Sequence, residues 1–284
     1  MSLMPRRACL RRLATTGLAT SGLALLPWPA FGAPLGGKAD RQALVIGNGD
    51  YPGAALRNAR ADAQLMASTL QGLGFQVRLQ QDLGLQPMLD QILAFLQASS
   101  QSAVRFIYFS GHGAQYRGRN YLLPVDVALK SEDDLPARAV DGTALIERVS
   151  GMAQGVNLLV FDACRTPPTR ARTRSLESKP EGMGPVVAPS GTLVAFSTAP
   201  NRVASDGPDR ANSLYTQALA EELRKPGVPI EAVFKRVRTA VAQGSGGQQV
   251  PWESSSLVGE LCFNGTGALA CDAPDPRGRV VKLR

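Results

Sequence analysis

Short apolar runs alternate along the chain with longer stretches whose apolar residues repeat at the spacing of a helix face. In Leu56–Leu73, for example, Ala59, Ala63, Met66 and Leu70 lie on one such face. The apolar runs predict strands at Gln42–Gly47, Phe75–Leu79, Arg105–Gly113, Asn157–Arg165, Gly191–Ser197 and Leu257–Phe263. The amphipathic stretches predict helices at Leu56–Leu73, Pro87–Gln97, Thr143–Met152, Ser213–Arg224 and Ile230–Ala242. This alternation predicts an α/β fold with a mostly parallel central sheet and helices on both faces.

Three segments break this alternation, and the first and last of them delimit one folded domain at residues 40–264. Residues 1–32 carry an Arg-Arg pair resembling the twin-arginine motif, then a moderately apolar stretch and small residues, as in a cleavable export signal. An uncleaved anchor is the alternative. Residues 165–189 are rich in Pro, Ser, Gly and charge, which predicts a surface loop. Residues 265–284 form a polar tail.

Charge and cysteine usage narrow the function classes. The formal net charge is +8, but four arginines of the signal contribute to it, and the remaining 27 basic and 23 acidic residues leave only +4. That excess is too small to predict nucleic-acid binding. After the signal we expect no membrane span, and the location is expected to be periplasmic or secreted. In such a compartment Cys262 and Cys271 either form a disulfide or remain two thiols.

Two of the predicted strands end at reactive side chains. The run RFIYFSGHG delivers His112, which is the only histidine, and NLLVFDACR delivers Cys164, 52 residues later. Because the carboxyl ends of parallel strands meet at one edge of a sheet, we expect the imidazole and the thiol to lie side by side. Taken singly, each residue is more often structural than catalytic. Their joint placement favours a catalytic pair.

These two segments resemble those of the caspase-like cysteine peptidases, the group of caspases, paracaspases and bacterial metacaspase relatives. The segments ALVIGNGDYPGAALRNARADAQLM, NYLLPVD and QVPWESSSLVGELCF extend the resemblance from about Arg41 to Phe263. Two residues depart from the caspase pattern and point towards metacaspases and paracaspases: Asp162 replaces a Gln and Thr166 replaces a Gly. The resemblance implies a caspase-like fold, with residues 40–168 similar to the large subunit and 190–264 to the small one.

The resemblance also implies the chemistry. A cysteine endopeptidase of this kind uses the thiolate of Cys164 as nucleophile, and His112 protonates the departing amine. It implies an oxyanion hole made by the N–H groups of Gly113 and Cys164, and a histidine oriented by backbone carbonyls. No metal and no cofactor is expected. A catalytically silent scaffold, or another acyl transfer on the same pair, remains an alternative, and the sequence does not give the oligomeric state.

A third set of residues predicts specificity. Ser110 and Asp162 precede His112 and Cys164 by two positions, so strand alternation places each on the same face as its reactive neighbour. Asp62 corresponds to an aspartate that metacaspases use in their primary specificity pocket. Two carboxylates and a hydroxyl suit a guanidinium or an ammonium group, which predicts protein or peptide substrates cleaved after Arg or Lys. The alternative is a solvated Asp62 and an Asp162 that only caps a strand.

Two charged stretches complete the picture. The acidic run at residues 132–134 lacks the alternating spacing of a calcium loop and is interpreted as solvated. The basic positions in the loop after the nucleophile are candidate self-cleavage sites, since a basic-selective enzyme would find them in an accessible chain. These positions are Arg170, Arg172, Arg174 and Lys179. Adventitious trimming of this loop by other proteases is the alternative.

Overall fold

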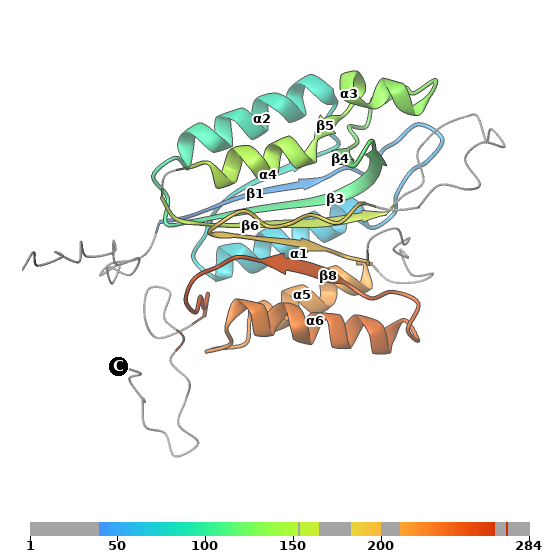
Figure 1. The fold of residues 1–284 in the computed structure, drawn as a ribbon. Coiled ribbons are helices and arrows are strands. Elements are labelled where there is room, and N and C mark those ends of the chain that lie inside the picture. Colours follow the sequence, from blue (N-terminus) through green and yellow to red (C-terminus); the bar gives the residue numbers. More distant parts are fainter. Residues whose placement is uncertain (1–39, 153, 165–182, 200–210, 265–270, 272–284) are drawn as a thin grey trace, which may run out of the picture. The chain divides into compact units, whose positions relative to one another are not determined.

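The computed structural model describes residues 40–152, 154–164, 183–199, 211–264 and 271 (Figure 1). The strands are β1 (Arg41–Gly47), β2 (Gln76–Gln81), β3 (Val104–Tyr116), β4 (Arg119–Leu122), β5 (Val140–Asp141), β6 (Val156–Cys164), β7 (Thr192–Phe196) and β8 (Trp252–Ser255). The helices are α1 (Ala59–Gly72), α2 (Leu85–Ala98), the 3-10 turn η1 (Glu132–Asp134), α3 (Leu135–Arg138), α4 (Gly142–Ser150), α5 (Leu214–Leu223) and α6 (Ile230–Gly244).

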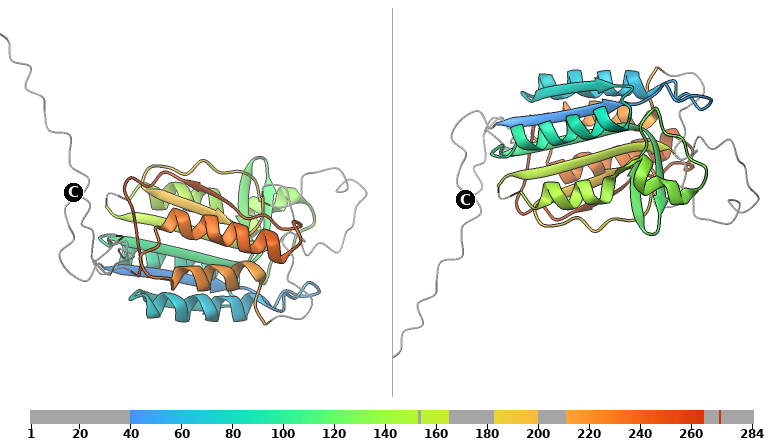
Figure 2. Two further views of the ribbon diagram at one scale, coloured as in Figure 1. Left: turned by 90° about the horizontal axis from the view of Figure 1, so that it is seen from below. Right: turned by 90° about the horizontal axis from the view of Figure 1, so that it is seen from above.

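The strands form one sheet in the order β2-β1-β3-β6-β7-β8, with β4 and β5 added beside β3. Along this order the four pairings between β2 and β7 are parallel. The fifth, between β7 and β8, is antiparallel. Helices α1, α5 and α6 cover one face, and α2 and α4 cover the other (Figures 1 and 2). The predicted α/β fold, a mostly parallel sheet between two helical layers, is confirmed.

The apolar residues of the central strands are buried on both faces, as expected when helices cover a parallel sheet. Alternate residues of β3 divide between the two cores: Phe106 and Tyr108 pack under α1, α5 and α6, while Ile107 and Phe109 pack under α2 and α4. This two-sided burial explains why the strand reads as a continuous apolar run. It also fixes which residues at the end of the strand face which layer.

The predicted last strand is wrong. The edge strand is β8, and its Ser254 pairs with Val194 of β7, whereas Leu257–Phe263 forms no strand. Leu261 and Phe263 are instead buried in the core under α1, where the Phe263 ring packs edge-on against Phe75 at 5.1 Å. The apolar run therefore fills the core as irregular chain, and apolarity alone did not distinguish these two roles.

The small strands beside the site were not predicted either. β3 continues past Gly113 to Tyr116, turns back through Arg117 and Gly118 with φ of 49° and 75°, and pairs with β4 as a hairpin. Two positive φ values in succession are typical of the tight hairpin turns that match the twist of the strands. The hairpin begins directly after His112.

Several sequence predictions concern other parts of the chain. The export signal at 1–32 lies outside the described residues, as do the four candidate cleavage positions in the loop after Cys164 and all of the tail except Cys271. Within the described residues, no helix is long and apolar enough to cross a membrane.

Candidate functional site

The candidate catalytic residues lie at the carboxyl edge of the sheet, where parallel strands β3 and β6 end together. In the register of this pair His112 lies directly opposite Cys164, and Ser110 lies opposite Asp162. The sequence prediction that two neighbouring strands deliver the histidine and the cysteine to one edge thus agrees with the backbone. The carboxyl edge of such a sheet is where ligands and chemistry collect in α/β proteins.

The imidazole of His112 is buried and held on several sides. Its Nε2 lies 2.8 Å from the carbonyl oxygen of Ala54, and its ring packs against the ring of Tyr51 with the centroids 4.4 Å apart. The backbone N–H of His112 donates to the hydroxyl of Tyr51 at 3.1 Å, and that hydroxyl donates to the carbonyl of Leu123 at 2.8 Å. The ring is therefore oriented by a backbone carbonyl, as the resemblance implied.

The loop that carries Tyr51 and Ala54 is itself anchored. The Oδ1 atom of Asp82 accepts hydrogen bonds from the N–H groups of Gly49 and Asp50 at 2.8 and 2.9 Å. Asp82 has φ of 50°, in the left-handed region that non-glycine residues seldom adopt. Its conformation is stabilised by these two bonds and by an ion pair with Arg60. None of these contacts was predicted from the sequence, because all of them join distant segments.

Asp62 reaches the same edge because helix α1 packs unusually close to the end of β1. A Cβ atom added at Gly47 would lie 2.5 Å from the carbonyl oxygen of Ala59 and 2.6 Å from Cβ of Ala63, so only glycine allows this approach. Asp62 is 1% exposed, and its Oδ1 accepts from the N–H of Ser213 at 2.9 Å. The alternative of a solvated helix residue is therefore wrong.

Asp162 is also buried, 5% exposed, on the face of the sheet that α5 covers. Its Oδ2 accepts from the hydroxyls of Ser213 at 2.5 Å and Thr216 at 2.8 Å. Ser213 begins α5 as its N-cap, with Oγ accepting from the N–H of Thr216. One serine thus bridges the two carboxylates, its N–H to Asp62 and its hydroxyl to Asp162. The sequence showed Ser213 as a helix start, but gave no sign of this bridge.

Comparison with known proteins agrees with this geometry. The family model of the caspase domain matches residues 40–262 of the 284-residue chain. The chain belongs to this family. It is therefore a cysteine peptidase, a hydrolase with protein substrates, which confirms the family and the enzyme class that the GHG and DAC segments predicted. No curated protein matches the sequence.

The electrostatics of this caspase domain reflect the two buried acids. Burial raises the pKa of the Tyr108 hydroxyl well above its ordinary value, and the negative charges of Asp162 and Asp62 raise it further. The pKa of Tyr215 is raised by burial first and then by the charges of Asp162 and Glu253. Both tyrosines therefore stay neutral beside the acids and contribute no competing charge. The Tyr108 hydroxyl is hydrogen-bonded to the hydroxyl of Thr216, and the Thr216 hydroxyl in turn donates to Asp162.

In the part of the caspase domain that the structure describes, no three His, Cys, Asp or Glu side chains lie together in a way that could hold a metal ion. The acidic run forms the turn η1, where the Oδ2 atom of Asp134 accepts from the N–H of Lys130 at 2.7 Å and of Ser131 at 3.1 Å. These bonds lower the pKa of Asp134. The run is thus engaged in capping its own turn.

Cys262 and Cys271 are joined by a disulfide with their Cα atoms 5.1 Å apart. Cys262 is buried between Leu261 and Phe263, both of which are part of the core. The disulfide therefore ties the chain beyond the last strand to the caspase domain.

Proposed function

We propose that the protein is an endopeptidase in which Cys164 and His112 act as a catalytic dyad. The observation that carries this proposal is their opposed register at the ends of β3 and β6, with Nε2 of His112 directed at the carbonyl of Ala54. In the neutral ring this hydrogen bond places the proton on Nε2, so that Nδ1 is the basic nitrogen. Nδ1 then takes the proton of the Cys164 thiol and returns it to the leaving amine.

The reaction follows from these roles. The thiolate attacks the scissile carbonyl, a carbon–sulfur bond forms, and the carbonyl electron pair moves to oxygen. The N–H groups of Gly113 and Cys164 stabilise that oxyanion. Its collapse expels the amine, protonated by His112, and leaves an acyl-enzyme. Water, deprotonated by His112, then releases the acid and regenerates the thiol.

We propose that cleavage follows Arg or Lys, selected by Asp62, Ser110 and Asp162. Supporting this, both carboxylates are buried near the dyad and share Ser213. Ser110 lies beside Asp162 across the strands. A buried carboxylate pair favours a cationic side chain, because charge-assisted hydrogen bonds to a guanidinium or ammonium compensate for the loss of water. An acidic substrate side chain would instead be repelled.

We also propose export of the chain by the signal at residues 1–32, to the periplasm or outside the cell, and self-cleavage at Arg170, Arg172, Arg174 or Lys179. The disulfide between Cys262 and Cys271 supports an oxidising compartment, because such bonds are rare where thiols are kept reduced. Self-cleavage is supported by the match between basic positions in a segment whose sequence predicts a surface loop and the basic selectivity that we propose for the pocket.

The test compares wild type with Cys164→Ala and His112→Ala on peptides ending in Arg, Lys, Asp or Asn. We expect wild type to cleave after Arg and Lys and both single variants to be inactive. The double variant should be scarcely worse than either single one, since dyad members act as a unit. Robust cleavage after Asp would refute the specificity. A fully active, folded Cys164→Ala protein would refute the mechanism. A folded wild type that cleaves none of the peptides would leave a scaffold role.

Self-cleavage is tested by incubating purified wild type beside Cys164→Ala and sequencing new N-termini. New termini after the four basic positions, in wild type alone, are the expected result. Identical fragments from both proteins would show that another protease made them.

A further inference from the structure

A buried asparagine binds one peptide of the chain next to the proposed catalytic strand. Asn120 of β4 is 1% exposed, and both ends of its side-chain amide contact Gly184. Its Nδ2 donates to the carbonyl oxygen of Gly184 at 3.1 Å, and its Oδ1 accepts from the Gly184 N–H at 2.6 Å. The side chain thus pairs with a peptide as a neighbouring strand would, and it satisfies two buried backbone groups.

The bound peptide brings Met183 against the glycine that follows His112. A Cβ atom added at Gly113 would lie 3.0 Å from Cβ of Ala163 and 3.3 Å from Sδ of Met183. Gly113 is therefore enclosed between the residue that precedes Cys164 and the Met183 side chain. Beyond it, Gly184 approaches the side chain of Gln115 so closely that an added Cβ would overlap it.

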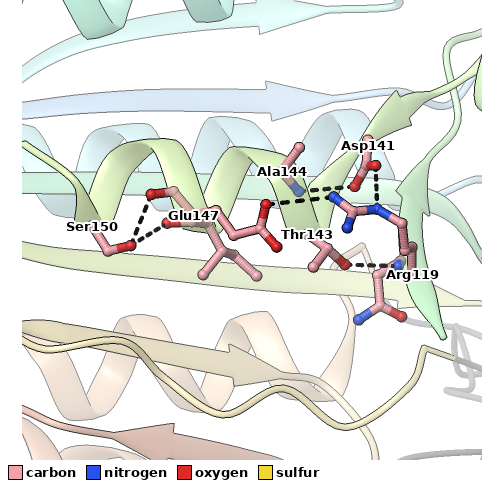
Figure 3. A network of polar contacts seen from close by, with 8 residues as sticks. Arg119, Asp141, Thr143, Ala144, Glu147 and Ser150 are labelled. Carbon is pink, nitrogen blue, oxygen red and sulfur yellow. Dashed lines mark hydrogen bonds and ion pairs between the residues drawn. The ribbon is translucent and has the colours of Figure 1, made fainter.

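Polar contacts between the neighbouring Arg119 and the start of helix α4, at Asp141 and Thr143, surround the place of Asn120 in the chain (Figure 3). The N–H of Asn120 donates to Oγ1 of Thr143 at 3.0 Å, and the adjacent Arg119 bonds through Nε to Oδ2 of Asp141 at 2.6 Å. Asp141 caps helix α4 with its other oxygen, 2.8 Å from the N–H of Ala144. The hydrogen bond to Asp141 raises the pKa of Arg119. Strand β4 is thereby fixed to the start of α4.

We propose that Asn120 is a positioning residue of the peptidase reaction, acting through Met183 on Gly113. Held by Asn120, Met183 closes the space beside Gly113 and fixes the peptide whose N–H we assigned to the oxyanion hole. The carbonyl of the same peptide, that of His112, accepts from the N–H of Leu123 at 3.0 Å, and Met183 restrains the glycine that follows it. Oxyanion donors work only when they are held in place before the reaction. This inference rests on the proposed function, and it adds two positioning residues to it.

The test uses Asn120→Ala and Met183→Ala, each assayed in three ways. The first is kcat and KM on an Arg-ending peptide. The second is affinity for the corresponding peptide aldehyde, whose adduct with Cys164 carries an oxygen that needs the oxyanion donors. The third is the rate of Cys164 alkylation by iodoacetamide, which needs the thiolate but no oxyanion hole. We expect kcat and aldehyde affinity to fall together by about tenfold or more, with KM and alkylation unchanged.

Asn264→Ala is the matched control, because it also removes a side-chain amide bond to a backbone carbonyl, that of Arg224, at the exposed end of α5. This variant should equal wild type in all three assays. Met183→Ala leaves the amide clamp intact, so it keeps the test open if Asn120→Ala fails to fold.

Two results would overturn the role of Asn120: alkylation falling in parallel with kcat, or unchanged kcat and aldehyde affinity in both variants. If wild type is active and the variants give either of these results, only this inference is refuted. A wild type that cleaves no peptide refutes the proposed function, and the positioning role with it.

Discussion

The Tyr51→Phe variant removes one buried hydroxyl that holds the backbone of His112. This hydroxyl has no part in the proposed catalytic chemistry. The hydroxyl accepts from the N–H of His112 and donates to the carbonyl of Leu123. That carbonyl keeps a second donor, Nδ2 of Asn48 at 3.3 Å, whereas the bond from the His112 N–H is removed. Loss of one buried backbone hydrogen bond costs about 1–3 kcal/mol, which is the expected loss in the free energy of unfolding. The bond from His112 to Ala54 survives, so the proposed dyad should remain active.

The same variant changes the pH dependence of stability. Burial raises the pKa of Tyr51 above its ordinary value, so folding disfavours the ionised form. The stabilisation from keeping this tyrosine neutral is complete below the unfolded pKa of 10.0 and is lost as the pH rises above it. Each such tyrosine lowers the free energy of unfolding by about 1.4 kcal/mol per pH unit in that range. Tyr51→Phe should therefore lose stability less steeply above pH 10 than wild type.

Urea unfolding between pH 7 and 11, with activity measured at pH 7, tests both expectations. Tyr116→Phe is the control, because its hydroxyl bonds to the exposed Asp133 and its loss should change stability by no more than about 0.5 kcal/mol. A Tyr51→Phe protein as stable as this control at pH 7, with the alkaline slope of wild type, would refute the reasoning. It would show that the His112 N–H finds another partner.

Three further variants test other parts of the molecule. Asp162→Asn should lower turnover of Arg-ending peptides at least tenfold while keeping the fold, since the pocket loses a charge worth about 2–5 kcal/mol to a buried cation; equal turnover would exclude it from the pocket. Arg105→Met should lower the free energy of unfolding by about 3 kcal/mol or more, because the buried guanidinium donates to three backbone carbonyls; a smaller loss by urea titration would contradict this. Cys271→Ser should cost about 2–3 kcal/mol, and reducing agent should destabilise wild type but not the variant.

The parts of the fold that the sequence predicted are those that depend on local pattern. Strands β3 and β6 were found because residues buried on both faces leave a continuous apolar run, and α1 because its buried residues repeat every three to four positions. His112 and Cys164 followed from these strands by a topological rule, since parallel neighbours must end at one edge. No distance had to be known for that step.

The parts that were missed depend on contacts between distant segments. The run before Phe263 is as apolar as a strand, but it packs into the core, while the more polar β8 takes the edge, where each of its residues is at least partly exposed. Ser213 and Asn120 are ordinary polar residues of a helix start and a hairpin. Only the fold brings the first between two buried acids and the second against Gly184.

The bridge through Ser213 links specificity to folding. Asp162 accepts from two hydroxyls in the first turn of α5, so the carboxylate that we assign to substrate recognition also holds the helix start against the sheet. A substrate cation would strengthen this arrangement, because it adds positive charge beside acids whose other partners are already in place. Each carboxylate thus has donors that the fold holds in place: two hydroxyls at Asp162, and the N–H of Ser213 and the amide of Asn212 at Asp62. A pocket for basic residues requires such donors, because they compensate the buried acids while no substrate is bound.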